Sequence, residues 1–109
     1  MVVWPAMVKF DGDPELDYLA DEIEWKRESE LHYLGYQEDD VLIDSVGSIF
    51  TLNDPKDNST KIMPTNKNST LEEVIELVKA HESSLGSCCV AKIGFDSILV
   101  AVNSIKSPL

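Results

Sequence analysis

Residues 3–19 read VWPAMVKFDGDPELDYL and decide how the fold begins. The apolar run before the turn predicts a strand over about residues 3–10. Because Pro5 has no N–H, this strand lies at a sheet edge or begins after the proline. Asp11-Gly12 is typical of a tight hairpin turn, because both residue types tolerate a positive φ. The alternating pattern of residues 15–19 then predicts the return strand, so the chain opens with an antiparallel hairpin.

Helix signals follow in three places. A helix over about residues 21–35 begins at a capping aspartate and ends at a glycine. The clearest helix begins at Ser69 or Thr70, carries an apolar stripe at helical spacing, and ends at Gly86. Residues 97–105 predict a third, short helix, although their nearly unbroken apolar run also fits a strand.

The remaining segments predict strands and one long loop. A second hairpin is expected at residues 41–44 and 48–52, and residues 88–95 predict a central strand because they are apolar on both faces. Residues 53–68 are polar, contain two prolines and predict a mobile loop, within which residues 60–63 could add a short strand. The order is β-β-α-β-β-α-β-α. The fold class is therefore α+β, with a largely antiparallel sheet and helices packed on one face.

The charge of the chain is strongly uneven. Its 109 residues suit one domain, 1–109, and carry a formal net charge of −11. The first 44 residues hold 13 of the 20 acids but only 3 of the 9 Lys and Arg residues. Such a balance argues against direct binding of nucleic acid and against an anionic membrane surface, since both need clustered cations. A basic protein is the partner that this charge would attract.

The sequence also indicates where the protein works. Its first residues lack the pattern of a secretory signal, and no apolar run is long enough to cross a membrane. Cys88 and Cys89 are adjacent and do not form a disulfide framework, so a reducing, cytoplasmic setting is expected.

Acidic residues from several elements predict a docking face for a basic partner. With two aromatic residues of the first helix region, the predicted binding residues are Asp21, Glu22, Glu24, Trp25, Glu28, Tyr36, Asp39 and Asp40. The alternative is a solvated acidic surface that only maintains solubility. A homodimer joined through an edge strand, such as the one near Pro5, is a third hypothesis.

The first helix carries two different stripes. Ile23 and Leu31 fall on an aliphatic side that also contains Arg27, whereas Trp25 and Tyr36 fall on an aromatic side. An exposed aromatic side would supply contact area with polar ends for binding. The alternative is that the rings are covered or lie flat along the sheet edge.

Glu82 lies within the apolar stripe of the clearest helix, directly after His81. A carboxylate there should be paired, hydrogen-bonded or shifted in pKa, and we hypothesise that Arg27 or Lys92 meets it. A functional interpretation makes Glu82 and His81 an acid–base pair of a small enzyme or a ligand-binding protein. The structural interpretation is a satisfied ion pair or a glutamate that reaches water.

No motif predicts a metal or a cofactor. The acids around Asp11-Gly12 do not match the spacing of a calcium loop. His32 and His81 lack the spacing of a zinc helix motif, and adjacent cysteines in a strand point to opposite faces. We therefore expect no metal site and no cofactor.

Four short motifs resemble those of a family of small, acidic bacterial proteins of unknown function. They are Trp4-Pro5-Ala6, the Asp11-Gly12 hairpin leading to Glu15-Leu16, Ile43-Asp44-Ser45 with Gly47, and Ala80-His81-Glu82 before Lys92-Ile93. The resemblance covers most of the chain outside residues 53–68. It implies a stand-alone bacterial cytoplasmic domain of about 110 residues, and it implies no substrate, cofactor or catalytic residue. The leading hypothesis comes from the acidic and aromatic residues: a non-enzymatic interaction module that presents an acidic face to a basic protein partner.

Overall fold

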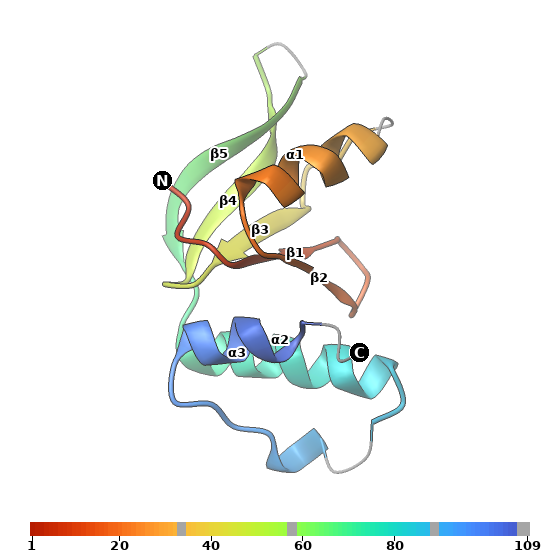
Figure 1. Ribbon diagram of the computed structural model, residues 1–109, viewed down its shortest axis with the longest axis vertical. Coiled ribbons are helices and arrows are strands. Elements are labelled where there is room, and N and C mark those ends of the chain that lie inside the picture. The colour runs from red at the N-terminus through yellow and green to blue at the C-terminus, as the bar shows by residue number, and fades with distance from the viewer. Residues whose placement is uncertain (33–34, 57–58, 88–89, 107–109) are drawn as a thin grey trace.

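The computed structural model describes residues 1–32, 35–56, 59–87 and 90–106. Within them the chain forms a five-stranded antiparallel sheet in the spatial order β2-β1-β3-β4-β5 (Figure 1). The elements are β1 (Ala6–Lys9), β2 (Leu16–Leu19), α1 (Glu22–Leu31), β3 (Val41–Asp44), β4 (Ser48–Asp54), β5 (Ser59–Asn68), α2 (Leu71–Ser84), the short 3₁₀ helix η1 (Val90–Lys92) and α3 (Ile98–Ser104). The predicted α+β class with an antiparallel sheet is confirmed.

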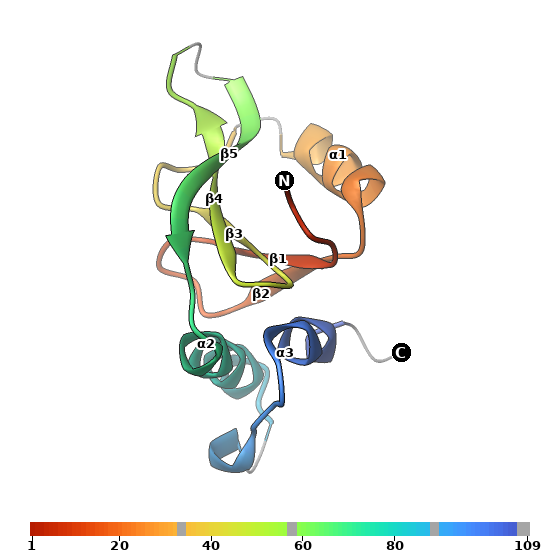
Figure 2. The ribbon, with the colours of Figure 1, turned by 90° about the vertical axis from the view of Figure 1, so that its left-hand side faces the viewer.

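Helices cover both faces of the sheet, not one face as predicted. α1 lies on one face, and α2 and α3 lie side by side on the other (Figures 1 and 2). The reason is visible in β1, where Ala6, Met7 and Val8 are all buried. Ala6 and Val8 belong to the core beneath α1, whereas Met7 belongs to the core against α2 and α3. A strand that is apolar on both sides needs cover on both sides.

The predicted loop at residues 53–68 is wrong, because most of this segment continues the sheet. Residues 53 and 54 end β4, and Ser59–Asn68 form β5, which pairs antiparallel with β4. β5 is an edge strand with many exposed polar residues, and it carries Lys61, Pro64 and Lys67. Lysine and proline are typical of strand edges that avoid pairing with other chains. The same residue types are common in loops, so the sequence predicted a loop where the structure has a strand.

The C-terminal region also differs from its prediction. Instead of a central strand at residues 88–95, Val90–Lys92 form η1, and Cys88 and Cys89 lie outside the described residues. The centre of the sheet is instead occupied by β1 and β3, each of which pairs with a strand on both sides. Ile98–Ser104 form the predicted helix α3, with Ser97 as its N-cap.

The strand after Pro5 is not an edge strand. β1 begins at Ala6 and is paired on both sides, with β2 and with β3. The sheet edges in the described structure are β2 and β5. A homodimer through an edge at Pro5 is therefore ruled out by this pairing.

Candidate interaction site

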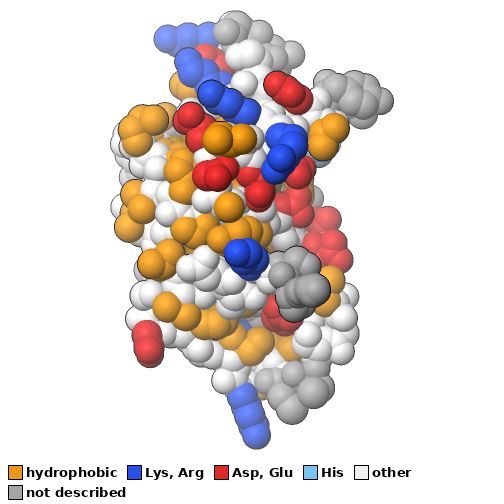
Figure 3. Space-filling model, in the orientation of Figure 1, with side chains coloured by type: hydrophobic (Ala, Val, Ile, Leu, Met, Phe, Trp, Pro, Cys, Tyr) orange, Lys and Arg blue, Asp and Glu red, His pale blue; other side chains and the backbone are white. Residues whose placement is uncertain are grey.

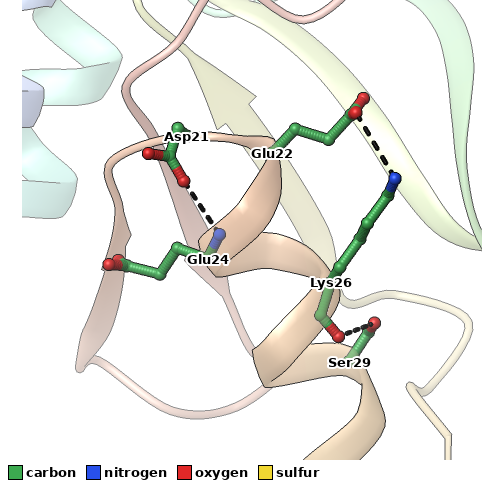
Figure 4. Close-up of polar contacts among 5 residues, drawn as sticks. All are labelled: Asp21, Glu22, Glu24, Lys26 and Ser29. Atoms are coloured by element: carbon green, nitrogen blue, oxygen red, sulfur yellow. Dashed lines mark hydrogen bonds and ion pairs between the residues drawn. The ribbon is translucent and has the colours of Figure 1, made fainter.

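Helix α1 packs on the sheet through its aromatic side. Asp21 caps the helix: its Oδ1 accepts the backbone N–H of Glu24 at 2.8 Å (Figure 4). Trp25 is buried, whereas Ile23 and Leu31 are 75% and 72% exposed. An indole ring covers more apolar area than an aliphatic side chain, so burying Trp25 gains more free energy. The prediction that Trp25 belongs to an exposed docking face is therefore wrong.

A stack of aromatic rings adjoins Trp25 and buries Tyr36 as well. The stacked rings are those of Phe10, His32, Tyr36 and Trp25. Burial, together with the nearby carboxylates of Glu28, Asp17 and Asp40, raises the pKa of Tyr36 to about 12. Tyr36 is 9% exposed and belongs to the core. It is not a docking residue, contrary to the prediction.

Asp40 is also a structural residue and not a surface ligand. Its side chain is 2% exposed. Oδ1 accepts the N–H of Asp11 at 2.7 Å and Oδ2 accepts the N–H of Gln37 at 2.8 Å. This carboxylate joins the turn before β3 to the β1–β2 hairpin, and a buried carboxylate requires such donors. The predicted binding role of Asp40 is therefore wrong.

Two of the predicted acids, Glu24 and Glu28, line an open groove of about 650 Å³ between α1, β2 and the end of α3. We call it the acidic groove. The residues that line it are Leu16, Asp17, Tyr18, Leu19, Ala20, Glu24, Glu28, Ile105 and Lys106. Asp17 comes from β2, and Glu24 and Glu28 come from successive turns of α1. Three carboxylates thus face one cation, Lys106, among these lining residues.

Further acids surround the acidic groove. Partial burial raises the pKa of the Asp17 carboxyl, and the carboxylates of Glu28, Asp13 and Glu15 raise it further, while His32 lowers it. Figure 3 shows acidic side chains gathered over α1 and the β1–β2 hairpin. Like charges that shift one another in this way lie close together. Asp13, Glu15 and Asp17 belong to the hairpin part of the acidic docking face predicted from the sequence, and the pairing of β1 with β2 places them beside α1.

Of the predicted acids, Glu22 and Asp39 lie outside the acidic groove, and Glu24 lines it but already has partners within the chain. Glu22 pairs with Lys26 at 3.6 Å on the side of α1 away from Glu24 (Figure 4). Glu24 accepts the N–H of Ala20 at 3.2 Å and pairs with Arg27 at 3.7 Å. Asp39 is exposed in the turn before β3, outside the acidic groove. Glu28 is therefore the predicted acid that is most available to a partner.

His81 is hydrogen-bonded to the backbone of β2. It is 7% exposed, and its Nδ1 accepts the N–H of Leu16 at 2.9 Å. A ring nitrogen that accepts this bond carries no proton, so the neutral ring bears its hydrogen on Nε2. A backbone N–H at the outer edge of a sheet is thereby satisfied.

Glu82 has a different partner from the one hypothesised. Its Oε2 accepts the hydroxyl of Ser87 at 3.1 Å. Arg27 pairs with Glu24 on the opposite side of the sheet, so the hypothesised contact with Arg27 is wrong. No ion pair joins Lys92 to Glu82 in the described structure. Glu82 and His81 line a cavity of about 450 Å³ with neighbours from the end of α3, where a carboxylate and a hydroxyl could bind a small polar molecule.

Comparison with known proteins places the whole fold in one family. The family model for DUF4144, described as a protein structure with unknown function, matches residues 4–105. The chain belongs to the DUF4144 family. A solved structure described as the NMR structure of the protein from Shewanella amazonensis is similar at 28% identity and a TM-score of 0.74. The match covers 96% of this chain and 88% of the other.

Three further findings concern curated relatives, membrane helices and metal sites. No curated protein matches the sequence. Across the part of the chain that the structure describes, no helix is both long and apolar enough to cross a membrane. In the same residues, no three His, Cys, Asp or Glu side chains lie close enough to share a metal ion.

Proposed function

We propose that this chain is a non-enzymatic interaction module whose acidic groove binds a basic segment of a protein partner. The observation that carries the proposal is the convergence of Asp17, Glu24 and Glu28 from two elements on one groove. Asp13 and Glu15 add negative charge beside it. Unpaired like charges cost stability when they are held together, and a cationic ligand relieves that cost.

The groove supports an extended Lys- or Arg-rich segment better than a compact ligand. It is open, and apolar atoms of Leu16, Leu19 and Ile105 line it beside the carboxylates. Long basic side chains bury their methylene stems on such a surface while their charged ends meet acids. Asp17 and Glu28 are exposed and free to pair, since Glu24 already holds Ala20 and Arg27.

Other parts of the sequence-based hypothesis remain proposals. The adjacent cysteines support a cytoplasmic setting, and the similarity to a Shewanella protein supports a bacterial origin. A homodimer through β2 would have one N–H fewer to pair with, because His81 already binds the N–H of Leu16.

A titration with a fluorescent peptide of alternating Lys and Ala residues tests the proposal. The variant Asp17→Asn/Glu28→Gln should weaken binding about fivefold or more at low salt, since each exposed ion pair contributes up to about 1 kcal/mol. The matched control is Glu72→Gln/Asp96→Asn, which removes two exposed acids near α2 and α3 and gives the same net charge.

The comparison between these variants separates a site from general attraction to a polyanion. Binding to the parent chain should weaken as salt screens the carboxylates. If both double variants lose the same affinity, the peptide senses only net charge and the acidic groove is not its site. If neither loses affinity, the acids only maintain solubility.

A further inference from the structure

The opposite flank of α1 carries a second groove of a different kind. It has a volume of about 570 Å³ and lies between α1, β5 and the N-terminal segment. In Figure 2, α1 and β5 stand on either side of the N-terminal end of the chain. We call it the tryptophan groove, because Trp4 and Trp25, the two tryptophans of the sequence, both line it.

Its inner wall is apolar and largely preformed. Trp25 and Phe50 belong to the buried core beneath α1, and Trp4 and Ile62 are partly buried against that core. Pro64 of β5 completes the apolar lining. A concave cavity of a few hundred Å³ with apolar and aromatic walls is the usual form of a site for a small organic molecule.

Two lysines stand at the rim on opposing elements. Lys26 comes from α1 and Lys61 from β5. Lys26 pairs with Glu22 at 3.6 Å, but both side chains are more than 60% exposed, and such pairs are weak. Lys61 makes no ion pair with any acid that the structure describes. Glu22 is the one acid among the lining residues, in a chain that carries 20 acids.

We propose that the tryptophan groove binds a small amphipathic organic anion. An apolar body would lie against Trp4, Trp25 and Phe50, and a carboxylate would reach Lys26 and Lys61 at the rim. Cations on two facing walls can share one anionic group, and aromatic walls select an apolar body. This ligand class is opposite in charge to the partner proposed for the acidic groove, so the two proposals stand or fall separately.

The tryptophans provide a direct measurement. All tryptophan emission of the chain comes from the two residues that line the groove. Dodecanoate, added below its micelle concentration, should shift that emission saturably, whereas dodecyltrimethylammonium, with the same chain and opposite charge, should bind more weakly. Equal binding of the two probes would overturn the assignment of an anion, and no saturable shift with dodecanoate would overturn the site.

Charge reversal locates the anionic end. Lys61→Glu should raise the dissociation constant for dodecanoate about fivefold, the upper end of the loss expected for one exposed ion pair. Lys92→Glu is the control, because it makes the same change in net charge at an exposed residue of η1, outside the groove. Thermal unfolding of both variants checks that they fold. Equal weakening by the two substitutions would show that Lys61 does not bind the anion.

Discussion

The two flanks of helix α1 present opposite chemistry within one small molecule. At the start of the helix, Asp21 and Glu24 point to one side and Glu22 and Lys26 to the other (Figure 4). The acidic groove lies between α1 and β2, and its carboxylates outnumber its cation. The tryptophan groove lies between α1 and β5, and its lysines outnumber its acid. One helix therefore separates two candidate sites that share no lining residue.

The difference shows that net charge does not specify local chemistry. A chain with a net charge of −11 attracts cations at long range, yet the lining of each groove decides what binds at contact. The acidic groove is open and follows an edge strand, β2, whose first N–H is held by the side chain of His81. The tryptophan groove is backed by the core itself. We therefore expect weak, salt-sensitive binding at the first and more selective binding at the second.

The largest effect is expected at Trp25, which supports the helix that divides the two grooves. Trp25→Ala should lower the free energy of unfolding by about 3–5 kcal/mol, because it leaves a cavity beneath α1. Urea unfolding followed by circular dichroism measures this loss. Both binding activities should be weakened in the folded fraction, since both grooves depend on the position of α1.

Ile23→Ala is the matched control on the same helix. Ile23 is 75% exposed, so its truncation should change stability by no more than about 0.5 kcal/mol. Similar losses for the two variants would mean that α1 does not pack through its aromatic side.

The next largest effect is expected at Asp40, which holds the hairpin beside the acidic groove. Asp40→Ala leaves the N–H groups of Asp11 and Gln37 without their carboxylate and should cost about 2–4 kcal/mol. The tryptophan groove, which Asp40 does not line, should keep its affinity for dodecanoate in the folded protein. Asp39→Ala, one residue away and exposed, should be nearly neutral. Asp39→Ala as costly as Asp40→Ala would contradict this assignment.

Much of the fold could be predicted from local signals. The Asp11-Gly12 hairpin, the capped helix after Thr70 and the turn between Asp44 and Gly47 depend on residues close in sequence. β5 was missed because a polar edge strand and a polar loop have the same composition. Its pairing with β4 depends on contacts across the sheet.

Only part of the candidate site could be predicted, because the rest also depends on contacts between distant segments. The sequence located the acids, including Glu24 and Glu28, but periodicity gives two stripes on α1 without saying which one meets the sheet. The tryptophan groove forms only when Trp4, Trp25 and Ile62 come together from three segments that are distant in the sequence. No spacing rule within one element can indicate such a meeting.

A smaller effect is expected at His81, which holds the strand at the base of the acidic groove. His81→Ala removes the acceptor of the Leu16 N–H and should cost about 1–3 kcal/mol. It should also weaken binding of the basic peptide, because Leu16 and Asp17 would lose their fixed position. Glu82→Gln keeps the contact with Ser87 and should be close to neutral in urea unfolding. A larger loss for Glu82→Gln than for His81→Ala would instead favour a structural role for the carboxylate.

The smallest effect is a pH dependence at Asp17, which lines the acidic groove and not the tryptophan groove. A raised carboxyl pKa means that the folded state binds this proton more tightly than the unfolded state does. The ionised carboxylate therefore opposes folding at neutral pH, and the penalty disappears as pH falls through the raised pKa. Asp17→Asn should stabilise the chain at pH 7 by about 0.5 kcal/mol or less, since the side chain is exposed and screened by water.

The gain from Asp17→Asn should shrink as pH falls towards 3.8, the ordinary pKa of an aspartate, and it should shrink in high salt. Thermal unfolding of parent and variant across this pH range measures it, with Asp96→Asn as the exposed control outside the cluster. The same substitution should weaken the basic peptide while leaving dodecanoate binding unchanged. A variant that is destabilised at neutral pH would mean that Asp17 makes a favourable contact, and the acids of this flank would then not repel one another.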